Sequence, residues 1–248
     1  MLTAGVDLAA ENKGTALAVV DWTMAGATVR ELHLGVADAQ IVDAVTSLSV
    51  AKLGIDCAFG WPDEFVTFVS EHARGERDPA APEGAMDWRR TLAYRETDRD
   101  VRQRTGRWPL SVSTDRLGLT AMRCAGLLAR LEAGGIAVDR SGLGTVVEVY
   151  PGASLRIWGL DTTGYRTLPT SRERLVRDLT TAAPWLDLGE HEGLMVASAD
   201  ALDAVIAAMT ARSAALGRCA PPPAPLLARA RREGWIALPP PGLEALVG

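Results

Sequence analysis

One strand that combines an apolar run with a single carboxylate constrains this chain more than any other feature. The segment at 52–62 is K-L-G-I-D-C-A-F-G-W-P, so Asp56 stands in an apolar run that Gly60 and Pro62 then interrupt. Aspartate is depleted in strands, and an ionised carboxylate is costly to bury unless a cation or hydrogen-bond donors accompany it. Asp56 therefore needs either a structural partner or a function.

A second strand repeats this pattern at the start of the chain. Residues 2–9, L-T-A-G-V-D-L-A, form a short apolar run near whose end Asp7 stands. Two carboxylates that lie close together favour the binding of a metal ion. The alternative is that each aspartate accepts backbone N–H groups in the loop after its strand, since Asp favours turns.

The composition is typical of a globular protein with one core and an insertion. The chain has 248 residues, of which 48% are hydrophobic and 23% charged, and its net charge of −5 argues against a globally basic nucleic-acid binder. Three widely spaced cysteines, Cys57, Cys124 and Cys219, predict neither a disulfide framework nor a thiolate zinc site. No apolar run approaches the roughly 20 residues that span a bilayer, and Asp7 interrupts any secretory signal. We therefore expect a cytoplasmic protein with no membrane partner, whose oligomeric state stays open.

The apolar pattern predicts strands and helices in a defined order. Strands are expected at residues 2–9, 15–22, 28–34, 52–58 and 144–150. Helices are expected at residues 38–49, with Asp38 as the N-cap, and at about 63–73, 114–133 and 198–216. A helix before the Asp56 strand indicates a crossover connection, which would place that strand parallel to the Asp7 strand and beside it.

Three further acids join the candidates. Glu148 interrupts the β-branched run G-T-V-V-E-V-Y at 144–150. Asp200 and Asp203 stand three residues apart in the first turns of the last predicted helix, so both can face the same point. The alternative for this pair is a favourable interaction with the helix dipole.

Residues 89–107 contain seven arginines against three acids. Arg95, Arg99 and Arg102 would share one face if the segment is helical, and with Asp98 they would form a wall over the carboxylates that contacts a phosphate or another anion. The alternative is a solvated helix face whose ion pairs contribute little.

Several motifs in fixed order resemble those of a known family. They are G-V-D-L-A at the start, G-I-D-C-A-F-G-W-P, Y-R-E-T-D-R followed by T-G-R-W-P, V-E-V-Y-P at Glu148, A-D-A-L-D-A-V-I-A-A-M-T-A-R, and E-G-W-I-A-L-P near the end. Over nearly the whole chain, this set resembles the DUF429 family, which is usually described as predicted ribonuclease H-like nucleases.

The resemblance implies an α/β fold of the ribonuclease H-like type. We expect a five-stranded mixed sheet in the order 3-2-1-4-5 with helices on both faces and an Arg-rich helical insertion. One domain would cover residues 1–248, with the insertion at about 74–115 and a Pro-rich C-terminal extension at about 219–248. Asp7 and Asp56 would lie at the switch point of such a sheet, where ligands bind.

The activity that the resemblance implies is metal-dependent hydrolysis of phosphodiester bonds by a two-metal nuclease. The expected catalytic residues are Asp7, Asp56 and Asp203, and the expected ligands of Mg²⁺ or Mn²⁺ are these three with Asp200 and Glu148. The residues expected to contact the substrate, a nucleic acid or another phosphate-bearing molecule, are Arg95, Asp98, Arg99 and Arg102. Two other classes stay open: a kinase-like phosphoryl-transfer enzyme of the same fold family, and a non-catalytic binding protein.

Overall fold

The computed structural model describes residues 1–77 and 84–247, which fold around one mixed β-sheet. In this part of the chain the sheet has seven strands in the order β6-β3-β2-β1-β4-β5-β7. The strands are β1 (Leu2–Asp7), β2 (Ala16–Trp22), β3 (Ala27–Leu34), β4 (Lys52–Asp56), β5 (Val146–Val149), β6 (Leu186–Asp187) and β7 (Ile236–Ala237). The prediction of an α/β chain with a mixed sheet is confirmed.

The centre of the sheet has the pairing that the crossover connection predicts. β1 pairs with β2 in antiparallel and with β4 in parallel orientation, and Asp7 is the register partner of Asp56. The predicted count of five strands is wrong, and the order differs accordingly, because β6 and β7 each extend the sheet at one edge. These strands have two residues each, too few to produce the periodic pattern by which a sequence reveals a strand.

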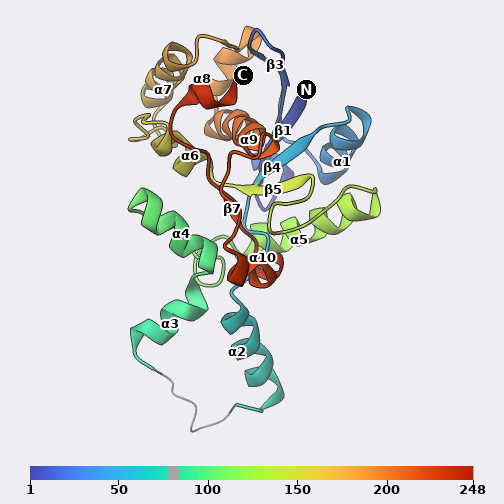
Figure 1. Ribbon diagram of the computed structural model, residues 1–248, viewed down its shortest axis with the longest axis vertical. Coiled ribbons are helices and arrows are strands. Elements are labelled where there is room, and N and C mark those ends of the chain that lie inside the picture. The colour runs from blue at the N-terminus through green and yellow to red at the C-terminus, as the bar shows by residue number, and fades with distance from the viewer. Residues whose placement is uncertain (78–83, 248) are drawn as a thin grey trace.

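Helices cover both faces of the sheet, as predicted (Figure 1). One face packs against α6 (Pro151–Ile157), α7 (Pro169–Ala182), α8 (Glu192–Ala197) and α9 (Ala199–Ala215), and the other packs against α1 (Asp38–Ser47) and α5 (Gly118–Ala133). Short 3-10 helices lie at Asn12–Gly14, Gly189–His191, Ala224–Leu226 and Leu243–Leu246. Asp38 is the first residue of α1, so the predicted N-cap is wrong by one position, and its carboxylate pairs with Arg123 instead.

Helix α9 lies directly against the backbone of the two central strands. A Cβ atom on Gly5 would stand 2.1 Å from the Ala204 carbonyl oxygen, and one on Gly54 would stand 2.6 Å from that of Ala207. Glycine in a strand marks such a close approach, and the small alanines of α9 permit it. Ser198 caps this helix by accepting a hydrogen bond from the backbone N–H of Ala201, as predicted.

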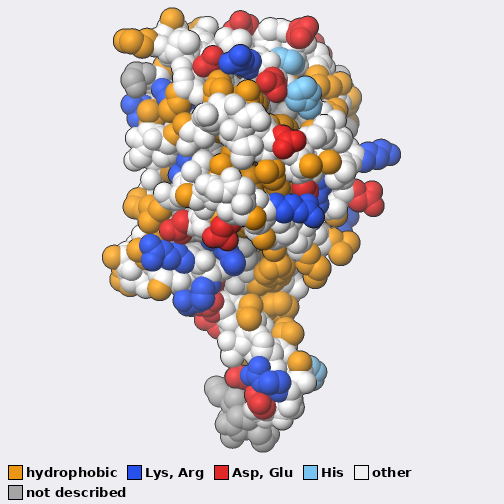
Figure 2. Space-filling model, turned by 90° about the vertical axis from the view of Figure 1, so that its right-hand side faces the viewer, with side chains coloured by type: hydrophobic (Ala, Val, Ile, Leu, Met, Phe, Trp, Pro, Cys, Tyr) orange, Lys and Arg blue, Asp and Glu red, His pale blue; other side chains and the backbone are white. Residues whose placement is uncertain are grey.

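A helical projection extends from the body of the molecule (Figures 1 and 2). It consists of α2 (Asp63–Arg74) and α3 (Met86–Ala93), and the chain returns through α4 (Glu96–Thr105). The expected insertion at about 74–115 contains α3 and α4, and its residues 78–83 lie outside the described residues. Figure 2 shows hydrophobic and charged side chains interspersed over this side of the body and the projection.

The C-terminal extension is part of the sheet and of the base of the projection. β7 pairs with β5, and the Ile236 N–H donates a hydrogen bond of 2.7 Å to Thr97 in α4. Helix α10 (Leu227–Glu233) contacts α2 and α4. Within residues 1–77 and 84–247, no helix combines the length and the apolar character that crossing a membrane requires.

Candidate functional site at the carboxyl ends of β1 and β4

Asp7 and Asp56 lie side by side where the two central parallel strands end. They are register partners, and neighbouring strands are roughly 4.8 Å apart. Because side chains alternate along a strand, both carboxylates point to the face that Gly5 and Gly54 also occupy, toward α9. Asp7 is 8% exposed, and the side chain of Asp56 is 22% exposed. The structure thus brings together the two strand acids that the sequence singles out.

Asp203 approaches the same region from α9 and is fully buried. Its carboxylate accepts hydrogen bonds from the Tyr165 hydroxyl at 3.0 and 3.2 Å, and from Arg166 Nε and Nη2 at 3.1 and 2.5 Å. Arg166 Nη2 also lies 4.0 Å from Asp56 Oδ2. One guanidinium therefore bridges the helix acid and a strand acid.

Burial and mutual repulsion raise the pKa of all three acids. Burial has the largest effect on Asp7, followed by the charges of Asp56 and Asp203, and the pKa of Asp7 lies well above its usual range. Burial and then Asp203 raise the pKa of Asp56 to about 8. Burial also raises the pKa of Asp203, although Arg166 and Tyr165 oppose this rise. Burial alone would lower the pKa of Arg166, but Asp203 and Asp56 outweigh it and keep the guanidinium charged.

The two strand acids, unlike Asp203, lack hydrogen-bond donors. In the part of the chain that the structure describes, no N–H or O–H group donates to the carboxylate of Asp7 or Asp56. Two neighbouring carboxylates in this position are costly unless a proton or a cation neutralises them. Mg²⁺ is commonly held by one or two carboxylates together with substrate phosphates. The donor set at Asp7 and Asp56 fits such an ion.

The wider set of expected metal ligands is not assembled around one point. Among the described residues, no three side chains of His, Cys, Asp or Glu are gathered so that they could hold a metal ion. Arg166 engages Asp203, as described above. Asp200 is half-buried in the first turn of α9, where its charge adds to burial and to the nearer acids in raising the pKa of Asp7.

Glu148 belongs to a separate, buried ion network. Arg95 donates to Glu148 at 2.7 and 2.9 Å and to Asp98 at 2.9 and 3.2 Å. The backbone N–H of Phe59 donates to Glu148 at 3.0 Å. The three charged side chains are at most 3% exposed, so this network fastens α4 to β5. Both carboxylate oxygens of Glu148 therefore accept hydrogen bonds, whereas those of Asp7 and Asp56 accept none from the described residues.

The arginines around α4 do not form one surface. Arg95 precedes the helix and points inward, where its side chain bonds to Glu148 and Asp98. Arg99 Nε lies 3.5 Å from Glu96, and Arg102 is exposed. Substrate contact by Arg99 and Arg102 stays a prediction, whereas the charges of Arg95 and Asp98 are already neutralised by buried partners.

Tyr165 and Arg166 are site residues that the sequence did not identify. They lie between α6 and α7, in a polar stretch without periodic pattern. Their partner Asp203 is 38 and 37 residues away, so an isolated Tyr-Arg pair gives no indication of what it contacts.

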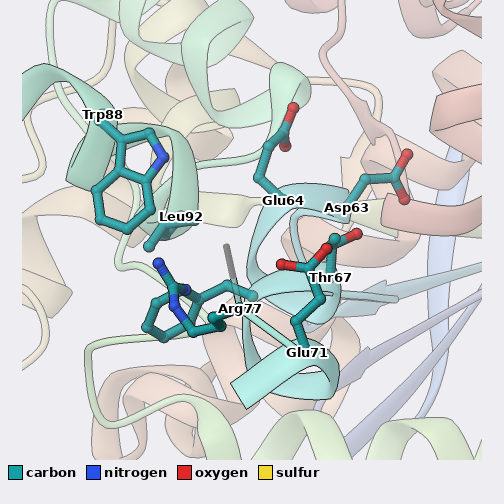
Figure 3. A pocket seen from close by; sticks show the side chains of 8 residues that line it. Asp63, Glu64, Thr67, Glu71, Arg77, Trp88 and Leu92 are labelled. Carbon is teal, nitrogen blue, oxygen red and sulfur yellow. The ribbon is translucent and has the colours of Figure 1, made fainter. Parts of the chain in front are cut away.

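A pocket of about 360 Å³ lies in the projection, between α2 and α3 (Figure 3). Its lining residues are Asp63, Glu64, Thr67, Phe68, Glu71, Arg77, Trp88 and Leu92. The Arg77 guanidinium stands 4.2 Å from the centre of the Phe68 ring, and Asp63 pairs with Arg232 at 2.6 Å. None of the candidate acids lines this pocket, so the candidate site is the one at the sheet.

Comparison with known proteins gives one result. A family model described as "Protein of unknown function (DUF429)" matches residues 5–227, a region that contains Asp7, Asp56, Arg166 and Asp203. No curated protein and no solved structure matches the chain. Because the family model covers most of the 248 residues, the chain belongs to the DUF429 family.

Proposed function

We propose that the chain is a metal-dependent hydrolase that cleaves phosphodiester bonds of nucleic acid, with Asp7 and Asp56 as ligands of Mg²⁺ or Mn²⁺. One observation carries this proposal: two carboxylates are register partners at the ends of parallel strands and have no hydrogen-bond donors in the described chain. A divalent cation between them would remove the repulsion that raises the pKa of both.

The order β3-β2-β1-β4-β5 in the middle of the sheet supports a ribonuclease H-like fold for this enzyme. In open α/β sheets, ligands bind outside the carboxyl ends of the strands at the point where the winding reverses. Asp7 and Asp56 end the two strands on either side of that point. A phosphate that binds there meets both acids.

The chain's own residues divide the work of binding and orientation. A bound Mg²⁺ or Mn²⁺ would supply Lewis-acid stabilisation of phosphate oxygens and activation of a water molecule. Asp7 and Asp56 would hold the cation, because the strand register places them side by side. Arg166, whose side chain is 57% exposed, offers a charged fork to a phosphate oxygen. The Tyr165 hydroxyl and Arg166 together keep the carboxylate of Asp203 oriented.

A binding protein without catalysis is the second candidate, and one observation favours it. Arg166 already neutralises Asp203 and approaches Asp56, so the acids can persist as a structural ion network. In that case the protein would not cleave any phosphodiester, and Mn²⁺ would not bind at Asp56.

Cleavage of a panel of DNA, RNA, hybrid and branched substrates in the presence of Mg²⁺ or Mn²⁺ tests the proposal. The wild-type protein should cleave at least one of these substrates, and Asp56→Asn should slow cleavage by about 100-fold or more because a metal ligand is lost. The matched control is Asp43→Asn, which makes the same change on the exposed side of α1 and should leave the rate unchanged. Failure to cleave any substrate, or cleavage that Asp56→Asn does not slow, would overturn the proposal.

A further inference from the structure

A second cavity, of about 140 Å³, opens beside Asp56 and Arg166. Most of its wall is apolar, and the apolar residues include Leu8, Ala58, Pro109, Leu110, Leu117 and Ile236. Leu110 and the side chain of Arg166 are each 57% exposed, whereas Glu148 is 1% exposed. The first two therefore stand at the mouth of the cavity and Glu148 at its floor. Asp56 and Arg166 belong both to this cavity and to the candidate site.

The floor of the cavity consists of charges that are already paired. Arg95 and Glu148 line it and bond to each other at 2.7 and 2.9 Å. The other N–H groups of Arg95 donate to Asp98 and to the carbonyl oxygen of Glu233. A charged group that reached this floor would lose its hydration without gaining an ion pair. The floor of the cavity therefore favours a neutral occupant.

Two hydroxyl groups in the wall are available to that occupant. Tyr150 and Thr120 line the cavity, and neither hydroxyl bonds to another group within residues 1–77 and 84–247. Apolar walls with a few polar groups that fix orientation are typical of sites for small organic groups. The occupant should therefore have apolar faces and polar edges.

The size of the cavity and the charge at its mouth restrict the occupant further. The volume of about 140 Å³ is well below the roughly 300–1,000 Å³ of sites for drug-sized ligands, so it suits one planar ring system. Arg166 stands at the mouth with its side chain 57% exposed and uses Nε and Nη2 for Asp203, so its Nη1 can donate to an anion attached to that ring. A nucleotide, in which a sugar joins a neutral heteroaromatic base to a phosphate, meets these requirements.

We propose that this cavity binds one unpaired nucleobase, and that the site thereby selects nucleic acid in which a base next to the reacting phosphate is not paired. The preference at the reacting phosphate rests on the proposed function, whereas binding of the base does not. In a duplex every base is stacked and paired, so it must be extruded before it can enter a pocket of this kind. Single-stranded or locally unpaired substrates avoid that cost.

Binding of nucleoside 5′-monophosphates, measured by calorimetry against ribose 5-phosphate, tests the cavity without any reaction. Stacking of a base on protein side chains predicts that the nucleotides bind roughly five- to 100-fold more tightly than the sugar phosphate. Thr120→Phe fills the cavity and should abolish this preference. Leu119→Phe is the matched control, because it adds the same ring one residue earlier on α5, where the side chain is 71% exposed.

Tyr150→Phe is a second variant, which keeps the aromatic ring and its packing. It removes only the hydroxyl, so nucleotide binding should weaken several-fold while ribose 5-phosphate binding stays the same. Equal binding of nucleotides and sugar phosphate, or a preference that survives both Thr120→Phe and Tyr150→Phe, would overturn the inference.

Two results separate this inference from the proposed function. In the first, the protein prefers nucleotides and Thr120→Phe loses this preference, but Mn²⁺ does not bind and no substrate is cleaved. The cavity then binds a base, and the chain is not a metal-dependent hydrolase. In the second, single-stranded and duplex substrates are cleaved at equal rates and the preference for nucleotides is absent. The chain is then a hydrolase, and the cavity does not bind a base.

Discussion

Asp203 and the two strand acids are neutralised in different ways. Asp203 is fully buried but has Tyr165 and Arg166 as partners. Asp7 and Asp56 face each other's charge, and the nearest cation to Asp56, Arg166, stands 4.0 Å away. A proton or a bound cation must therefore neutralise the strand acids, and which of the two does so depends on pH.

The stability of the metal-free protein should depend on pH because Asp56 takes up a proton. Its pKa is about 8 in the fold, against roughly 3.9 in an unfolded chain, so between these values the folded state holds a proton that the unfolded state releases. The contribution of Asp56 to the free energy of unfolding is thus present below pH 4 and is lost as pH rises to 8, by about 1 kcal/mol per pH unit. Urea unfolding in EDTA measures this slope.

The Asp56→Asn variant supplies the reference for that measurement, because asparagine does not titrate. Relative to the variant, wild-type protein should lose stability steadily from pH 4 to pH 8 and change little above it. Parallel pH profiles of the two proteins would show that Asp56 has an ordinary pKa.

Replacing Arg166 should show how much its ion pair with Asp203 contributes to the free energy of unfolding. Arg166→Ala leaves the buried carboxylate with only the Tyr165 hydroxyl as a donor, and we expect a loss of about 1–3 kcal/mol because Arg166 is itself half-exposed. The double variant Arg166→Ala, Asp203→Asn removes the unpaired charge and should recover most of this loss. Urea unfolding at pH 7 measures both; a loss below about 0.5 kcal/mol would mean that the pair is solvated.

At the scale of elements, the site depends on how closely α9 packs on β1 and β4. Val6 and Ile55 point into the opposite core, while Gly5 and Gly54 leave room for the helix that presents Asp203. The distance between the helix acid and the strand acids is therefore set by glycines that have no catalytic chemistry of their own.

Gly5→Ala should separate α9 from the sheet. Its Cβ would lie 2.1 Å from the Ala204 carbonyl oxygen and 2.2 Å from the Ala208 nitrogen, both of which are helix backbone, so we expect a loss of about 3 kcal/mol or more in unfolding experiments. Gly126→Ala is the matched control, since a Cβ on this exposed α5 residue meets no atom within 4 Å and should stabilise the helix slightly. Equal stability of the two variants would contradict the close packing.

For the molecule as a whole, periodic patterns in the sequence predict the long helices and the central strands. Strands that contain Asp7 and Asp56 have continuous apolar runs, and the helix between them determines that they are parallel neighbours. The long alanine-rich helix was equally recognisable from Ser198 at its start. The two central acids and the helix acid therefore followed from local sequence and a topological rule.

The rest of the site depends on contacts between distant segments, which leave no local pattern. Arg166 meets Asp203 from 37 residues away, in a loop without periodicity. Arg95 looked like part of an exposed helix face, but it precedes α4 and turns inward because Glu148 offers a buried carboxylate. The edge strands β6 and β7 form only because neighbouring strands pair with them.

Asp7 and Asp56 should together bind a divalent cation, and calorimetric titration with Mn²⁺ measures this binding. At pH 8 the wild-type protein should bind Mn²⁺, Asp56→Asn should weaken binding by about tenfold or more, and Asp43→Asn should not change it. The wild-type affinity should also fall by up to about tenfold per pH unit below 8, because a proton on Asp56 must leave before the metal binds. Absence of Mn²⁺ binding at pH 8, or binding that Asp56→Asn leaves unchanged, would show that the two strand acids are not metal ligands.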